Sequence, residues 1–191
     1  MTLLRRAGSG RLTDGSRLVW TVAEGSRGRR WRWTHTTNAG LASVGLLELD
    51  QQGGFSRLEL GSPVGLLTLH VDQSGGEVHG NVAGPAGMQH LRFLWSSDNS
   101  VLVDGEPLVA AAMCHRLASR FDPRPTHEHG LLLVEPSFAV RDTLGWFTRE
   151  SETRWRIELS QARRFRIAID AQGLPTALGD ESSWPLEVDE P

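Results

Sequence analysis

Apolar and polar residues alternate with a period of two along much of the chain, most clearly over residues 154–159 and 164–170. Successive side chains leave opposite faces of a β-strand, so this period is typical of a strand with one buried face. Both runs therefore predict strands that carry an apolar face and an arginine-rich face. The apolar positions are Trp155, Ile157, Leu159, Phe165, Ile167 and Ile169.

The first half of the chain shows the same alternation. Residues 17–23 and 29–36 alternate, and the second run places Trp31 and Trp33 opposite Arg30 and Arg32. Further runs follow at ~8–12-residue intervals and are separated by turns rich in glycine and proline, which is typical of a sandwich, barrel or half-barrel. These runs lie at residues 43–50, 55–60, 65–71, 78–82 and 89–95.

Residues 106–120 form the one segment with the pattern of a helix. Pro107 suits its first turn, and His115, Arg116 and Arg120 suit the negative end of the helix dipole. The following loop, residues 121–130, contains two prolines and is expected to be irregular. Because strands and helices do not alternate, a parallel nucleotide-binding sheet is not expected.

The fold class that follows is mainly β, a single-domain antiparallel meander that forms a curved half-barrel with one helix near residues 106–120. We expect residues 1–16 to be a loose lead-in that is rich in Gly, Ser and Arg. Residues 17–178 form the single β-rich domain. Residues 179–191 are an acidic surface tail.

Composition excludes several classes of protein. The chain has 191 residues, 39% hydrophobic and 23% charged, and a formal net charge of -3, which is typical of a globular domain and not of a nucleic-acid binder. A single cysteine, Cys114, leaves no internal disulfide framework. Neither a signal peptide nor a run of ~18 apolar residues is found, so we expect a cytoplasmic protein with no membrane span and no nucleic-acid partner.

Candidate chemistry is sparse, because the chain has no phosphate-binding glycine loop and no Gly-x-Ser-x-Gly elbow. The sharpest motif is His127-Glu-His129, since two histidines spaced in this way can ligate zinc, iron or copper. It resembles the first cupin metal motif, although Glu135 lies six residues further on and the Pro85–His90 segment precedes the motif. The alternative interpretation is a solvated, proline-bounded loop whose histidines face water.

Five short segments occur in a fixed order within residues 29–178: Leu67–Asp72 with Gly75, Pro107–Leu117, Glu135–Val140, Trp146–Arg149 and Ile169–Leu174. Their order resembles that of a bacterial family of uncharacterised proteins that carries a glycolipid-binding label. The resemblance implies a half-barrel similar to bacterial lipoprotein carriers, with a helix against its concave face and a lipid or glycolipid ligand. It implies no catalytic residues.

The leading hypothesis is therefore a non-enzymatic protein that binds an apolar or amphipathic small molecule in a tryptophan-lined concavity, without a cofactor. A second hypothesis is a metal-dependent, cupin-like enzyme that uses His127 and His129. A third is a closed-core structural or partner-binding module that dimerises through a sheet edge. The residues expected at the ligand are Trp31, Trp33, Trp155, Ile157, Phe165 and Ile167 in the wall, with Arg30 and Arg164 at the rim.

Overall fold

The computed structural model describes residues 4–11, 14–120, 126–160, 163–178 and 182–183. These residues divide into two compact units, an N-terminal unit up to Ser97 and a C-terminal unit that begins at Asp98. Each unit holds one β-sheet, and the single α-helix belongs to the C-terminal unit. The mainly β fold class predicted from the alternation is confirmed.

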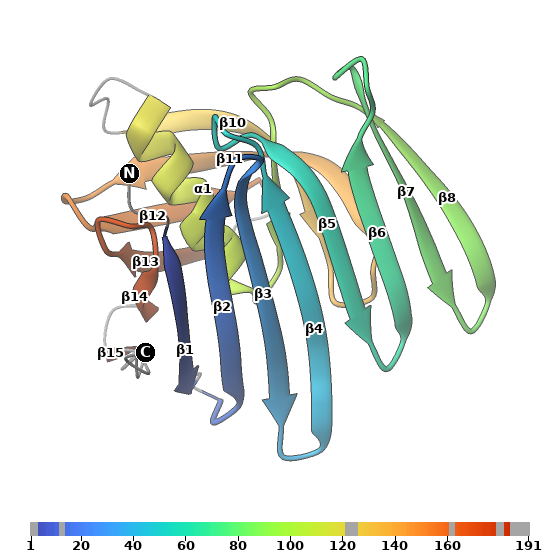
Figure 1. Cartoon of the computed structure of the whole chain (residues 1–191), viewed down its shortest axis with the longest axis horizontal. Coiled ribbons are helices and arrows are strands. Elements are labelled where there is room, and N and C mark those ends of the chain that lie inside the picture. The colour runs from blue at the N-terminus through green and yellow to red at the C-terminus, as the bar shows by residue number, and fades with distance from the viewer. Residues whose placement is uncertain (1–3, 12–13, 121–125, 161–162, 179–181, 184–191) are drawn as a thin grey trace. The chain divides into compact units, whose positions relative to one another are not determined.

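The N-terminal unit is an eight-stranded antiparallel meander in which every strand pairs with its neighbour in the chain (Figure 1). Short turns join the strands, as the glycine-rich spacing predicts. The strands are β1 (Arg5–Arg11), β2 (Arg17–Gly25), β3 (Gly28–Thr37), β4 (Gly40–Leu49), β5 (Phe55–Ser62), β6 (Gly65–Val71), β7 (Glu77–Gly84) and β8 (Gly87–Leu94).

The register of this sheet aligns the apolar positions of successive strands on one face. Trp20 lies opposite Trp33, and Val22 lies opposite Trp31. Next to them Gly45 leaves room for the Trp33 ring, because a Cβ at this position would lie 2.0 Å from its Cζ2 atom. A slip of one residue would turn this entire apolar set to the opposite face, so burial fixes the register.

The structure differs from the predicted lead-in, because Arg5–Arg11 forms β1 and all seven residues pair with β2. Gly8 and Gly10 are buried opposite Trp20 and Leu18. Glycine carries no side chain to show alternation, so this strand left no apolar pattern in the sequence. Residues 1–3 and 12–13 lie outside the described residues.

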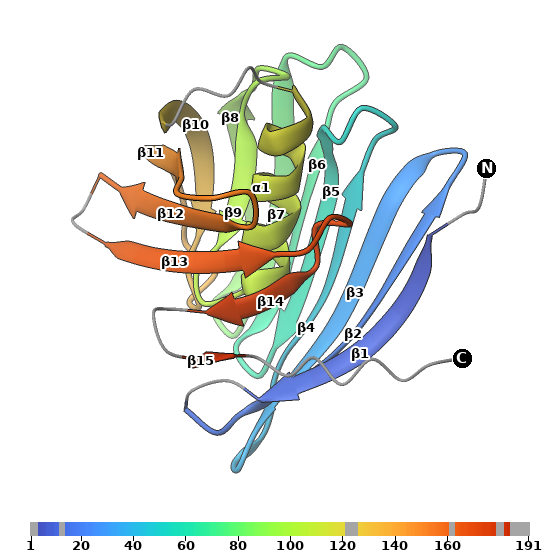
Figure 2. The same ribbon diagram turned by 90° about the vertical axis from the view of Figure 1, so that its left-hand side faces the viewer.

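The C-terminal unit is a curled half-barrel sheet with the helix beside it (Figure 2). The predicted helix is confirmed, and its bounds are those of α1 (Pro107–Arg120). The strands are β9 (Ser100–Val103), β10 (Thr126–Val134), β11 (Val140–Arg149), β12 (Arg154–Leu159), β13 (Arg164–Ile169), β14 (Pro175–Leu178) and β15 (Ser182–Ser183), ordered β15-β14-β13-β12-β11-β10-β9 in the sheet.

One strand pair departs from the predicted antiparallel pattern, because β9 and β10 run parallel. The helix lies between them in the chain and returns it to the end of the sheet where β9 began, which is how parallel neighbours are connected. The predicted irregular loop is also wrong for residues 126–130, which belong to β10. A proline restricts itself and the residue before it, so Pro125 does not prevent pairing from Thr126 onward.

Helix α1 and the sheet share the core of the C-terminal unit. Cys114 and Leu117 of the helix are buried in one cluster with Phe147, Trp155 and Ile157 of the sheet. Of the predicted acidic tail, only residues 182–183 are described, and the rest lies outside the described residues. Among the described residues no helix has both the length and the hydropathy that a membrane crossing requires.

Candidate functional site

The residues predicted to form one ligand wall lie in two different sheets. Trp155, Ile157 and Ile167 are at most 1% exposed and belong to the core cluster that includes α1, while Phe165 packs against that cluster. In the C-terminal unit these four side chains therefore fill a core. Trp31 and Trp33 lie in β3 of the N-terminal unit.

The two arginines predicted at the rim each have a carboxylate partner. Arg30 forms an ion pair with Glu48, which lies opposite it on β4, and Arg164 forms one with Glu158. Both guanidinium groups are more than half exposed. Because successive side chains alternate, Arg30 points away from the face that carries Trp31.

Three tryptophans on the buried face of β2 and β3 have unpartnered indole N–H groups. Trp20, Trp31 and Trp33 are 1%, 0% and 3% exposed, and the rings of Trp20 and Trp31 lie 6.4 Å apart. None of their Nε1 atoms has a hydrogen-bond partner among the described residues. Buried indole N–H groups usually have one, and leaving such a donor unpaired costs about 1–3 kcal/mol. This face therefore carries three neighbouring donors that lack an acceptor.

A hydrogen-bonded chain of three polar residues lies near the end of the same face. The hydroxyl of Ser16 donates to Asp14 Oδ1 over 2.5 Å, and Ser16 Oγ lies 2.7 Å from Nε2 of His35. The Ser16 hydroxyl lowers the pKa of Asp14, and burial lowers the pKa of His35 although Asp14 acts against it. Because the serine proton goes to the carboxylate, His35 is not placed to activate Ser16 as a nucleophile.

A second serine–histidine pair includes His129, one of the two predicted metal ligands. Arg116 Nη1 donates to Ser100 Oγ over 2.7 Å, and Ser100 Oγ lies 2.9 Å from Nε2 of His129, within hydrogen-bond distance. Ser100 and His129 are both buried, and His129 also packs edge-on against Phe147. The network joins β9, α1 and β10. His127 lies two positions earlier on the same face of β10.

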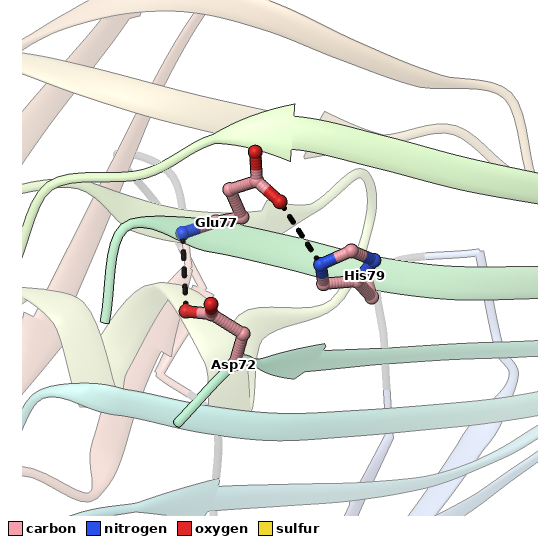
Figure 3. Close-up of side chains that lie close together, drawn as sticks. All are labelled: Asp72, Glu77 and His79. Carbon is pink, nitrogen blue, oxygen red and sulfur yellow. Dashed lines mark hydrogen bonds and ion pairs between the residues drawn. The ribbon is translucent and has the colours of Figure 1, made fainter. Parts of the chain in front are cut away.

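The group of three potential metal ligands found among the described residues includes neither of these histidines. It consists of Asp72, Glu77 and His79, whose ligand atoms all lie within 4.8 Å of one another at the β6–β7 turn (Figure 3). Glu77 Oε2 lies 3.1 Å from His79 Nε2, and the backbone N–H of Glu77 donates to Asp72 Oδ1 over 3.2 Å. The ring of His79 also stacks on that of His70, with centroids 6.1 Å apart.

Both carboxylates of this cluster already have partners. Arg92 Nε donates to Glu77 Oε2 over 2.8 Å, and Arg92 is the main cause of the lowered pKa of Glu77. The hydroxyl of Ser74 donates to Asp72 over 2.6 Å and is the main cause of the lowered pKa of that group. The cluster thus closes a hairpin and pairs charges across strands. The polar–apolar–polar order of residues 70–72 and 77–79 on either side of a short turn is the sequence signal that could have revealed this cluster.

A cavity of about 310 Å³ opens in the C-terminal unit at the C-terminal end of α1. The guanidinium of Arg149 stands over the ring of Trp155 at 5.9 Å and donates to the backbone oxygens of Ser151 and Glu152. This volume is at the lower limit of small-molecule sites. The lining residues are His115, Ala118, Ser119, Arg149, Glu152, Thr153, Ile169, Asp170 and Ala171.

Comparison with known proteins gives one structural neighbour. No family model matches the chain, and no curated protein matches it. The crystal structure of a DUF1089 family protein from Pseudomonas aeruginosa is similar with a TM-score of 0.49 and 14% sequence identity, over 93% of this chain and 91% of that one. At this level of similarity the neighbour says nothing about the activity of this chain.

Proposed function

We propose that this protein binds, without transforming it, an amphipathic molecule that has an apolar body and hydrogen-bond-accepting oxygens, as lipids and glycolipids do. The observation that carries the proposal is the set of buried, unpartnered indole N–H groups of Trp20, Trp31 and Trp33. No acceptor for them is found among the described residues. A ligand that brings oxygen atoms would supply what this face lacks.

The surroundings of the indoles favour such a ligand. The two positions in register with Trp31 are aliphatic, Val22 on β2 and Leu47 on β4. Each indole N–H that gains an acceptor would recover about 1–3 kcal/mol. Burying about 200 Å² of alkyl surface would add about 5 kcal/mol. Because the indoles are almost fully buried, uptake requires a local opening and is expected to be slow.

The test begins with native mass spectrometry of the purified full chain, to detect a retained lipid. Delipidated protein is then titrated with octyl glucoside below its micelle concentration, and tryptophan fluorescence is followed. We expect saturable binding. The double variant Trp31→Phe/Trp33→Phe replaces each indole by a smaller phenyl ring and removes both N–H donors, so its affinity should fall by about fivefold or more for each lost bond.

The matched control is Trp146→Phe, because the indole of Trp146 already donates to Glu128 over 3.2 Å. Its affinity for the glucoside should equal that of the unaltered chain. Two results would overturn the proposal: a chain that neither retains lipid nor takes up the probe, or a double variant that binds as tightly as the control.

A further inference from the structure

Strand β8 is an edge of the eight-stranded sheet and pairs only with β7 among the described strands. Gly87 closes the hairpin opposite Gly84, and at the other end the N–H of Trp95 bonds to the carbonyl of Gly76 over 2.9 Å. Hydrogen-bonding directions alternate along an antiparallel ladder. The odd-numbered residues of β8 therefore bond to β7, and the backbone groups of the even-numbered residues point away from the sheet.

Two apolar side chains along this edge are also exposed to solvent. Met88 is 66% exposed and Leu94 is 81% exposed. Natural edge strands usually avoid pairing through lysine, proline, a bulge or a very short length. β8 is eight residues long, has no proline and no lysine, keeps one register throughout, and carries Arg92 as its one charged side chain. β8 therefore lacks the features that usually prevent an edge strand from pairing with a further strand.

We propose that two copies of this chain associate through β8, antiparallel about a two-fold axis at Leu91. In this register Met88 lies opposite Leu94 of the second copy, and His90 lies opposite Arg92. All of these residues have outward-pointing backbone groups, so the pairing forms about eight new backbone hydrogen bonds. Two separate eight-stranded sheets become one continuous sheet.

The side chains select this register over its neighbours. A shift of two residues in one direction places Arg92 opposite Arg92 of the second copy, which is repulsive. The same shift in the other direction places Met88 opposite Arg92 and leaves Leu94 without a partner. A shift by one residue brings side chains of opposite faces together. In the proposed register the charge of Arg92 remains balanced by Glu77 of its own chain.

The occupant is a second copy because the strand is complementary to itself. Met88 and Leu94 are the two most exposed apolar side chains of β8, and the two-fold axis pairs Met88 of each copy with Leu94 of the other. A single strand edge buries less than about 1,000 Å², so we expect a weak, transient dimer.

Sedimentation velocity of the full chain from about 5 to about 500 μM tests the association. The average mass should rise from 21.0 kDa toward twice that value. Leu94→Arg places a charge opposite Met88 and should keep the chain monomeric over the whole range. Leu144→Arg, at a 44% exposed position of β11, is the matched control and should dimerise like the unaltered chain. A monomer at every concentration, or equal dimerisation of both variants, would overturn the proposal.

Disulfide trapping tests the register. The two copies of residue 91 face each other across the axis at about 4.5 Å between Cα atoms, which suits a disulfide. Leu91→Cys should cross-link rapidly under mild oxidation. Gln89→Cys, two positions away on the same face, lies opposite Phe93 of the second copy and should cross-link slowly. The native Cys114 is buried and does not interfere. Equal rates for the two variants would contradict the two-fold axis at Leu91.

Discussion

Glu106 places a carboxyl group in the interior immediately before helix α1. Its side chain is 5% exposed, and its Oε1 accepts a hydrogen bond of 3.4 Å from the backbone N–H of Leu108. Burial raises the pKa of Glu106 from 4.5 to about 8, and the hydrogen bond from Leu108 acts against this. At neutral pH the group is therefore protonated in the folded chain and ionised in the unfolded chain.

The consequence for stability follows from proton linkage. Between pH 4.5 and about 8 the folded state holds one proton more than the unfolded state, so the free energy of unfolding falls as pH rises. The contribution is fully present below pH 4.5 and is lost as pH rises through about 8. The slope is about 1.4 kcal/mol per pH unit, so the interval corresponds to a loss of about 5 kcal/mol.

Substitution of Glu106 by glutamine should remove this dependence. Glutamine keeps the shape and the acceptor oxygen but cannot ionise. The stability of Glu106→Gln relative to the unaltered chain should therefore grow by about 3 kcal/mol between about pH 5 and about pH 7. Urea unfolding, followed by tryptophan fluorescence at each pH, measures the free energy of unfolding of both chains. Glu152→Gln, at an exposed carboxylate, is the control. A Glu106→Gln difference that stays constant over this pH range would refute the buried-carboxyl reasoning.

Three further outcomes are expected. Gly45→Ala should destabilise the chain by about 1–3 kcal/mol because its Cβ would collide with the Trp33 ring, whereas Gly25→Ala, with no atom within 4 Å, should stay within about 0.5 kcal/mol in the same urea titration. Ser100→Ala should cost about 1–3 kcal/mol, since the buried Arg116 and His129 side chains each lose a hydrogen bond, and a smaller loss would contradict the network. Burial raises the pKa of Cys114, so its thiol should react with a disulfide reagent only in denaturant; rapid reaction of the folded chain would show that solvent reaches it.

The helix and most strands could be predicted because their signals are local. The alternation at residues 154–159 reports which face of one strand is buried, and the structure has β12 there. Pro107 and the basic C-terminal end of α1 marked the helix in the same way. β1 escaped prediction because its buried positions are glycines. The start of β10, which carries His127, was predicted to be part of an irregular loop because two prolines precede it in the sequence.

The candidate sites were harder to predict because each depends on residues that are distant in sequence. Alternation showed that Trp31 and Trp33 share a face, but only the pairing with β2 brings Trp20 beside them. Whether an indole N–H has an acceptor depends on every neighbour around it. His129 looked like a metal ligand from its spacing, and only the fold places Ser100 against it.

The order of hydrophobic and polar residues by itself determined that this chain forms half-buried strands, one helix and short turns, since these depend on side-chain direction and backbone preference within a few residues. The tertiary structure decided the parallel pairing of β9 with β10, the burial of Glu106 and the open backbone of β8. Each of these depends on which distant segment occupies the neighbouring position. Burial and strand pairing are produced by contacts between segments that are distant in sequence, and these contacts exist only once the chain has folded.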